Sequence, residues 1–251
     1  MATEKIAQAA ALLVQARRTM TPIAGLPEAC RPASVTEAHA IQDATTTALA
    51  KPVAAFKASM PPNAEPNRGL IYAGTVHPTP ASIPAAAVPD CGVEGEVAFI
   101  FRRDFPARAQ PYTRDEVAAA VDALAAIEVV DSRYIDRTKV TNLENLADSV
   151  SNGAFVHAAP VADWRGLDLG NLPVRLTVNG ETVLQREGGH PTGDPLGVAV
   201  ALVNMMREGP GVHAGQFVTC GTFTGLRFLK PGDVCGVAFE GLGAAEVTFA
   251  R

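Results

Sequence analysis

Acidic residues stand inside two of the most apolar stretches of the sequence, where a charged side chain is costly to bury. Glu94 and Glu96 interrupt the run 93–101, and Glu128 interrupts the run 126–130. Side chains of a strand alternate between the two faces of a sheet, so Glu94 and Glu96 would point to one face, about 7 Å apart. Two carboxylates in apolar surroundings repel each other and lose hydration unless a cation lies between them. A hard divalent cation such as Mg²⁺, which prefers oxygen ligands, would satisfy both.

Glu128 could complete a set of three carboxylates around such a cation, because apolar residues flank it on both sides. The alternative is that both strands keep one solvated face and that the acids point to water. The spacing alone does not decide between a metal site and a solvated face.

Two further polar groups adjoin apolar strand sequence. Lys57 lies in the run 53–58 and is either an edge-strand residue that discourages aggregation or a buried cation with a function. Asp131 and Arg133 follow the stretch that contains Glu128, and the arginine could bind a substrate carboxylate or form a local salt bridge. The pattern leaves the role of all three residues open.

Helical patterns come before any strong strand pattern and recur between the strands. Residues 4–20 carry apolar side chains at helical spacing, and Ser34–Glu37 forms a capping box for a second helix that ends near Leu49. Another capping box, Thr113–Glu116, opens a helix that we expect to continue to about Ala125. Asp194 and a first-turn proline begin a further helix.

Strand patterns dominate the last two thirds of the chain. The Asn179-Gly180 pair between two β-rich runs predicts a hairpin, and apolar runs at 216–220, 234–239 and 245–249 predict further strands. We therefore predict an α+β fold with a mixed, curled sheet. We expect an N-terminal helical subdomain over residues 1–75 and a catalytic β domain over residues 76–251.

Composition excludes several classes of protein. The 251 residues include 21 basic and 26 acidic side chains, a net charge of -5 without a basic patch, which argues against a nucleic-acid partner. Apolar runs are too short to cross a membrane and no signal sequence is recognisable, so we expect a cytoplasmic protein. The four cysteines are widely spaced, as is typical of buried reduced thiols rather than of a zinc site or disulfide framework.

Short motifs follow one another along nearly the whole chain in a familiar order. They are Ala55–Ser59, Val93–Phe99, Ala126–Arg133, Ala147–Gly153, Gly193–Leu196, Thr219–Thr222, Pro231–Asp233 and Glu240–Gly243. No single motif is specific, but the co-linear set resembles the 2-keto-4-pentenoate hydratase and 4-oxalocrotonate decarboxylase branch of the fumarylacetoacetate hydrolase superfamily. This resemblance implies a mixed β-roll core behind an N-terminal helical part, and a homo-oligomer.

The resemblance also implies a metal site and a substrate class. Glu94, Glu96 and Glu128 would hold Mg²⁺ or Mn²⁺, and Lys57 would lie in the same pocket. The substrates would be small 2-hydroxydienoic or 2-oxo acids that chelate the ion and react through a metal-bound enolate. The candidate catalytic residues are Lys57, Asp148 and Ser151, and the candidate substrate-binding residues are Arg133, Asp131 and Thr222.

Two departures from the family pattern concern the choice of reaction. The segment Ile71–Gly74 lacks an acidic residue that many members carry near this point, and Ser149 stands where relatives often have asparagine. We expect a hydratase (a hydro-lyase) of aromatic meta-cleavage catabolism. The alternatives are a 2-oxo acid decarboxylase of the 4-oxalocrotonate type, an acylpyruvate C–C hydrolase, or a non-catalytic partner subunit.

Overall fold

The structure is a computed structural model that describes residues 2–251. Its helices are α1 (Ala2–Thr19), α2 (Val35–Leu49), α3 (Arg114–Ala118), α4 (Asn142–Ala147) and α5 (Pro195–Met206). Its strands are β1 (Val53–Ser59), β2 (Asn67–Tyr72), β3 (Val76–Pro78), β4 (Ala81–Pro84), β5 (Gly92–Phe101), β6 (Val121–Val130), β7 (Asn152–His157), β8 (Pro173–Val178), β9 (Glu181–Glu187), β10 (Phe217–Thr222), β11 (Arg227–Phe228), β12 (Val234–Phe239) and β13 (Gly243–Ala250).

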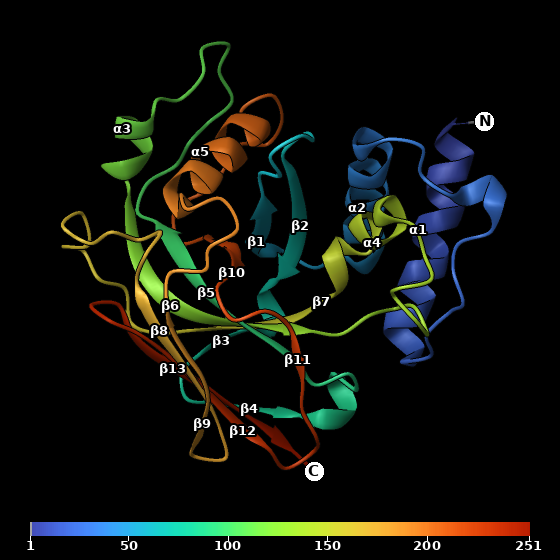
Figure 1. The fold of residues 1–251 in the computed structure, drawn as a ribbon. Coiled ribbons are helices and arrows are strands. Elements are labelled where there is room, and N and C mark those ends of the chain that lie inside the picture. The colour runs from blue at the N-terminus through green and yellow to red at the C-terminus, as the bar shows by residue number, and fades with distance from the viewer. Residues whose placement is uncertain (1) are drawn as a thin grey trace.

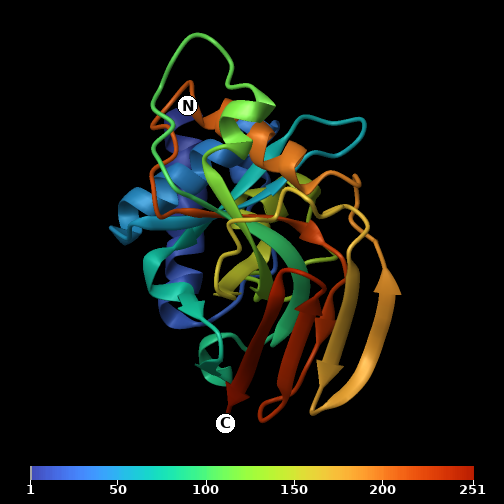
Figure 2. The same ribbon diagram turned by 90° about the vertical axis from the view of Figure 1, so that its left-hand side faces the viewer.

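The described strands form two sheets. The larger has the order β2-β1-β10-β5-β6-β7-β3, with β11 on the end of β5, and the smaller has the order β4-β13-β12-β8-β9. The larger sheet curls, so that β2 at one end also contacts β7 near the other end. Figures 1 and 2 show the smaller sheet below it, while α1, α2 and α4 gather at one side. This arrangement confirms the predicted α+β fold with a mixed, curled sheet.

The two faces of the curled sheet have different neighbours. Phe99 and Phe101 of β5 point to the main core, which β12 and β13 of the smaller sheet close. The opposite face is the inside of the curl and holds a small apolar cluster. Its buried members are Ala55, Ile71, Ala98, Leu124, Ala126, Phe155 and Phe217. Because side chains alternate along a strand, the residues that continue this inner face toward the start of β5 are Glu96 and Glu94.

The N-terminal helices have a core of their own. Leu13 of α1 and Ile41 of α2 are fully buried and pack with Leu26 and Tyr134. The hydroxyl of Ser34 accepts a hydrogen bond from the amide of Glu37, whereas the carboxylate of Glu37 accepts from the amide of Ala33 and not from that of Ser34, so only half of the predicted capping box forms. The helical part thus packs beside the sheet around a separate apolar cluster.

Several local predictions are confirmed and one is wrong. Asn179 and Gly180 have φ of 52° and 83° between β8 and β9, and Asp194 caps α5. The helix expected to reach Ala125 instead ends at Ala118, and β6 begins at Val121. All ten residues of β6 pair with β5. This long-range pairing overrides the helical preference of the alanine-rich sequence.

The expected boundary near residue 75 follows two strands of the larger sheet. Both β1 and β2 precede it, yet β1 pairs with β10 in the larger sheet. A parallel partner more than 150 positions away leaves no local signal in the sequence.

Within residues 2–251, the cysteines Cys30, Cys91, Cys220 and Cys235 are free and buried. No helix in this range is both long and apolar enough to cross a membrane.

Candidate active site

Three glutamates converge at the inner face of the curled sheet. Antiparallel pairing places Glu94 of β5 directly opposite Glu128 of β6, and Glu96 lies two residues further along the same face of β5. One carboxylate oxygen from each of these residues lies within 4.8 Å of the others. Glu96 and Glu128 are buried, with 1% and 0% of their surface exposed. The acids therefore face one another rather than solvent.

Lys57 reaches this cluster from β1, which lies beyond β10 in the sheet. Its Nζ is 2.8 Å from Oε2 of Glu128 and 3.2 Å from Oε2 of Glu94. Burial by itself lowers the pKa of Lys57, but the negative charges of Glu128, Glu94 and Glu96 outweigh burial and raise it. Lys57 is thus a buried ammonium group held among carboxylates, and not a residue that protects a sheet edge.

Glu96 is the carboxylate whose surroundings are least able to satisfy its charge. Its Oε2 accepts hydrogen bonds from the hydroxyl of Thr219 and, at 2.8 Å, from the amide of Gly221. Its Oε1 is buried and has no hydrogen-bond partner among the described residues. Burial, followed by repulsion from Glu128, raises the pKa of Glu96 to about 8 even though Lys57 opposes the shift.

The cluster fits a divalent cation in charge and in donor type. When all three carboxyl groups are ionised, as binding of a cation requires, three carboxylates and one ammonium group leave two negative charges in a largely buried space. Such an excess is costly unless a cation neutralises it, and carboxylate oxygens are the preferred ligands of Mg²⁺ and Mn²⁺. Oε1 of Glu96 accepts no hydrogen bond from the described residues, so its lone pairs are available to a cation. The residues present therefore match the metal that the sequence implies.

A left-handed turn, Ser149–Ser151, positions a further group at the cluster. Its three residues have φ of 55°, 54° and 58°, although none is glycine. The central residue is the β-branched Val150, for which this conformation costs of order 1–3 kcal/mol. Directly after the turn, Nδ2 of Asn152 donates to Oε1 of Glu128 at 3.2 Å. The strain thus accompanies a segment that orients one of the glutamates.

Ser151 belongs to this turn and has a buried hydroxyl. Its Oγ has no hydrogen-bond partner among residues 2–251. The turn lies close to β2, because a Cβ on Gly69 would be 2.6 Å from the carbonyl oxygen of Ser149. Gly69 in turn pairs with Lys57. A glycine at this position lets the turn approach the strand that neighbours the lysine.

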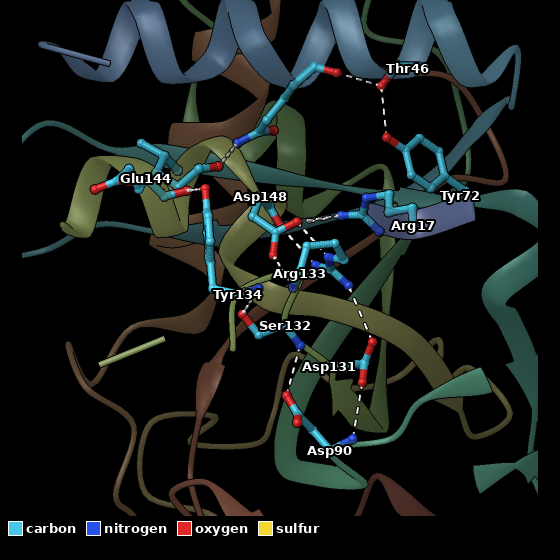
Figure 3. Close-up of polar contacts among 12 residues, drawn as sticks. Arg17, Thr46, Tyr72, Asp90, Asp131, Ser132, Arg133, Tyr134, Glu144 and Asp148 are labelled. Carbon is cyan, nitrogen blue, oxygen red and sulfur yellow. Dashed lines mark hydrogen bonds and ion pairs between the residues drawn. The ribbon is translucent and has the colours of Figure 1, made fainter. Parts of the chain in front are cut away.

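Asp148 immediately precedes the turn and is the centre of a buried ionic network (Figure 3). Its Oδ1 is 2.6 Å from Nε of Arg133 and 3.1 Å from Nη2 of Arg17 on α1. Its Oδ2 accepts from the backbone amide of Arg133 at 3.0 Å. The carboxylate is 1% exposed as a residue and fully paired. Asp148 and Arg133 therefore bind each other and connect the strained turn to the N-terminal helix.

Asp131 lies on the outer side of the same network (Figure 3). Its Oδ1 accepts from the amide of Asp90 at 3.1 Å, and Oδ2 of Asp90 accepts from the amide of Ser132 at 2.9 Å. Asp131 and Arg133 line a cavity of about 300 Å³ together with Arg17, and no glutamate of the cluster is among its described lining residues. The structure thus brings Asp131 and Arg133 together but places them at a cavity that the glutamates do not line.

Thr222 lies beside the glutamates at the end of β10. It is opposite Glu96 in the register, across a bulge that separates it from Thr219. Its hydroxyl accepts from the amide of Thr224 at 3.2 Å. The adjacent Gly221 donates to Glu96, so the predicted substrate-binding threonine adjoins the carboxylate cluster.

Several residues that contact the glutamates escaped the sequence-based prediction. Asn152, Thr219 and Gly221 each donate a hydrogen bond to a cluster carboxylate. Ser59 and Asn67 are hydrogen-bonded to each other and share the face of Lys57, because strand residues two apart point the same way. All except Asn67 lie within the motifs of the family pattern, but only the tertiary structure shows which groups they contact.

Comparisons with known proteins agree with this architecture. The family model for the fumarylacetoacetate (FAA) hydrolase C-terminal region matches residues 35–250. A 2-keto-4-pentenoate hydratase of Paraburkholderia phymatum is 30% identical over 98% of this chain and 98% of that protein. A 4-oxalocrotonate decarboxylase of Pseudomonas putida is 31% identical over 67% of this chain and 66% of that protein.

Solved structures show the same fold. The 4-oxalocrotonate decarboxylase of Pseudomonas putida G7 complexed with calcium and acetate has a TM-score of 0.84 at 22% identity, over 98% of both chains. The same enzyme complexed with magnesium and adipate has a TM-score of 0.81 at 21% identity over the same shares. The predicted mixed β-roll with N-terminal helices is therefore confirmed.

Proposed function

Because this chain belongs to the fumarylacetoacetate hydrolase family, we propose that it is a divalent-metal-dependent hydratase of small 2-hydroxydienoic or 2-oxo acids. Relatives aligned over nearly the whole chain are named 2-keto-4-pentenoate hydratases. The observation that carries the proposal is the convergence of three glutamates with Lys57 in a buried space. The chemistry belongs to aromatic meta-cleavage catabolism.

Glu94, Glu96 and Glu128 would hold the metal, which we propose to be Mg²⁺ or Mn²⁺. When bound, such a cation supplies Lewis-acid stabilisation to the negative charge that develops on the substrate's oxygen. Hydrogen bonds from Asn152 and from the amide of Gly221 orient two of the three carboxylates before the ion arrives. The protein side of the site is therefore largely pre-organised.

The proposed reaction balances as a tautomerisation followed by addition of water. The dienol 2-hydroxypenta-2,4-dienoate loses its hydroxyl proton and gains a proton at C5, which gives the 2-oxo-3-enoate. Water then places its hydroxyl group on C4 and a proton on C3. The product is a 4-hydroxy-2-oxo acid, and no oxidant or reductant is needed.

Lys57 would hold a proton at Nζ and place a positive charge beside the reacting oxygen atoms. Its raised pKa keeps it an ammonium group, so it acts as a hydrogen-bond donor and not as the base. The unpartnered hydroxyl of Ser151 is a candidate to position substrate or water. Thr222, beside the cluster, is a candidate to bind the polar end of the substrate.

Three of the candidate residues would hold other groups in place without contacting the substrate: Asp148, Arg133 and Asp131. Asp148 and Arg133 neutralise each other at 2.6 Å, so neither charge is free for a proton transfer in this arrangement. We propose that they hold the left-handed turn, and with it Ser151, against the inner face of the sheet. Asp131 would fix the adjoining loop through its bond with Asp90.

The test of the function is metal-dependent turnover. The purified protein is freed of metal and mixed with 2-hydroxypenta-2,4-dienoate, with and without Mg²⁺, while the dienol absorbance is followed. Loss of absorbance that requires the metal, with one hydrated product, supports the hydratase. A protein that turns over no acid of this class with either metal contradicts it.

Decarboxylation is the second candidate, and one feature of the site favours it. The segment Ala73–Thr75 carries no acid, and Asp148 is fully paired, so a free carboxylate that could serve as a hydration base is missing among the described residues near the turn. Loss of CO₂ from a 2-oxo diacid needs charge stabilisation but no base to activate water. Release of CO₂ from 4-oxalocrotonate distinguishes this reaction, whereas acylpyruvate hydrolysis would release two acids.

We further propose that the chain acts as a homo-oligomer in the cytoplasm. Ile135 and Phe228 are large apolar side chains with 72% and 59% of their surface exposed in the single chain. An interface between copies would cover such groups. Sedimentation velocity of the full chain tests this, and a monomer at micromolar concentration would contradict it.

A further inference from the structure

His190 lies in the loop between β9 and α5, near the strand that supports the glutamate cluster. It is 8% exposed, and its Nε2 is 2.8 Å from the carbonyl oxygen of Cys220 on β10. A carbonyl oxygen only accepts hydrogen bonds, so Nε2 must carry the proton and donate it. The contact therefore fixes one side of the imidazole ring.

The other side of the ring is fixed as well. The backbone amide of Thr192 donates to Nδ1 of His190 at 3.3 Å, so Nδ1 carries no proton. The ring also contacts Phe223, with 5.3 Å between ring centroids. His190 is thus a neutral imidazole of defined tautomer, held in one orientation by a donor, an acceptor and an aromatic neighbour.

The peptide that receives this hydrogen bond also contacts a metal-site glutamate. The carbonyl of Cys220 and the amide of Gly221 belong to one planar peptide unit, and the amide donates to Oε2 of Glu96 at 2.8 Å. The two polar groups of a trans peptide point in opposite directions. One rigid unit therefore has His190 bound on one side and Glu96 on the other.

The backbone at this point is unusual, so it needs external support. The register between β10 and β5 is interrupted between Thr219 and Thr222, and Gly221 has φ of +118°, which L side chains rarely adopt. A Cβ on Gly221 would lie 3.4 Å from Nε2 of His190. The bulge interrupts the regular ladder with β5 at this peptide, and His190 supplies a hydrogen bond to its carbonyl.

We propose that His190 is a positioning residue of the metal site, acting on Glu96 through the Cys220–Gly221 peptide. By holding the carbonyl, it aims the amide at Oε2 of Glu96, and polarisation of the peptide strengthens that bond. With Oε2 engaged by the protein, Oε1 stays free for the cation. This inference rests on the proposed function, because it assumes that the glutamates bind a divalent metal.

The test compares His190→Gln with His190→Met in the full chain. Glutamine can place an amide N–H near the position of Nε2, whereas methionine has a similar length and no donor. Metal-free proteins are titrated with Mn²⁺, and free Mn²⁺ is measured by electron paramagnetic resonance. We expect His190→Met to weaken Mn²⁺ binding about tenfold, as is typical when an outer partner of a ligand is lost, and His190→Gln to stay within about threefold of the unmodified chain.

If His190 only stabilises the fold, the Mn²⁺ titration gives a different result. Thermal unfolding of the metal-free variants is measured in parallel; equal Mn²⁺ affinity of the two variants, whatever their stability, overturns the inference. If the unmodified chain binds no Mn²⁺, the proposed function itself fails. Should His190→Met not fold, ¹⁵N-histidine NMR of the unmodified chain decides: a protonated Nε2 and a bare Nδ1 support the inference, and the reverse tautomer overturns it.

Discussion

Titration of metal binding against pH tests the site through the buried carboxyl group of Glu96. Burial and the charge of Glu128 raise the pKa of Glu96 to about 8 in the metal-free protein, although Lys57 opposes the shift. A carboxyl group must lose its proton before it binds a cation. We therefore expect binding of Mg²⁺ or Mn²⁺ to release a proton at neutral pH.

The magnitude follows from the pKa of Glu96. With a value of about 8, roughly one tenth of this group is ionised at pH 7 and roughly one hundredth at pH 6. The apparent affinity for Mn²⁺ should rise roughly tenfold per pH unit over this range and level off above about pH 9. Calorimetric titration in two buffers of different ionisation enthalpy measures the affinity and the released protons, which we expect to be about one per ion at pH 7.

Glu96→Gln provides a well-matched variant. The carboxamide oxygen can accept the bonds from Thr219 and Gly221, and the NH₂ group takes the place of the unpartnered Oε1. We expect weaker Mn²⁺ binding with an affinity that changes less steeply with pH, because burial also raises the pKa of Glu128. Glu94→Gln is the control, since it also removes a ligand but leaves the proton of Glu96 in place. An affinity in the unmodified chain that is equal at pH 6 and pH 9 would refute the reasoning.

The same proton makes the stability of the metal-free protein depend on pH. The pKa of Glu96 in the folded chain lies above its ordinary value of 4.5, so between these values the folded state holds a proton that the unfolded state has lost. Stability is therefore lost as the pH rises from about 4.5 to about 8, by up to about 1.4 kcal/mol per pH unit. Urea denaturation at about pH 5 and about pH 8 should show this loss in the unmodified chain and a smaller loss in Glu96→Gln, because burial also raises the pKa of Glu128.

Three further substitutions have expected outcomes. Lys57→Met should lower kcat by about 10²–10⁴-fold without weakening Mn²⁺ binding, because it removes a proton-bearing group and a competing positive charge; weaker binding would argue against this role. Asp148→Asn should lower the free energy of unfolding by about 3–5 kcal/mol in a denaturation assay, because it leaves two buried arginines poorly paired. Glu208→Gln, which removes an exposed ion pair, should lower it by less than about 1 kcal/mol in the same assay. Gly69→Ala should lower the free energy of unfolding by about 1–3 kcal/mol and reduce turnover, because the added Cβ would collide with the left-handed turn. Gly74→Ala, which has open space around the added Cβ, should change neither. Equal stability of these two variants would contradict the proposed close packing.

The arginine network explains why the N-terminal helices matter to a site built on strands. Arg17 reaches from α1 to Asp148 (Figure 3). The turn that directly follows Asp148 leads to Asn152, which donates a hydrogen bond to Glu128. A carboxylate shared by two arginines in a buried space is stable only while both partners are present. The helical part therefore supports the geometry of the glutamate cluster without contributing a metal ligand.

Patterns of short range determined much of this protein from its sequence alone. The two-residue period of a strand places Glu94 and Glu96 on one face, although the spacing leaves open whether that face binds a cation or meets solvent. Caps at Ser34 and Asp194 and the turn at Asn179 follow from the preferences of single side chains. These effects act within a few residues, so an isolated sequence is enough to predict them.

Only the tertiary structure decided which groups meet. Lys57 precedes Glu94 by 37 positions and lies two strands away, yet the curl of the sheet brings its ammonium group to within 3.2 Å of that carboxylate. Asp148 is a candidate catalytic residue in the sequence, but in the fold its carboxylate pairs with Arg133 and Arg17. Contacts between distant segments decide the strand register, the curl of the sheet and the choice among ionic partners. These contacts depend on the whole chain, so no short stretch of sequence indicates them.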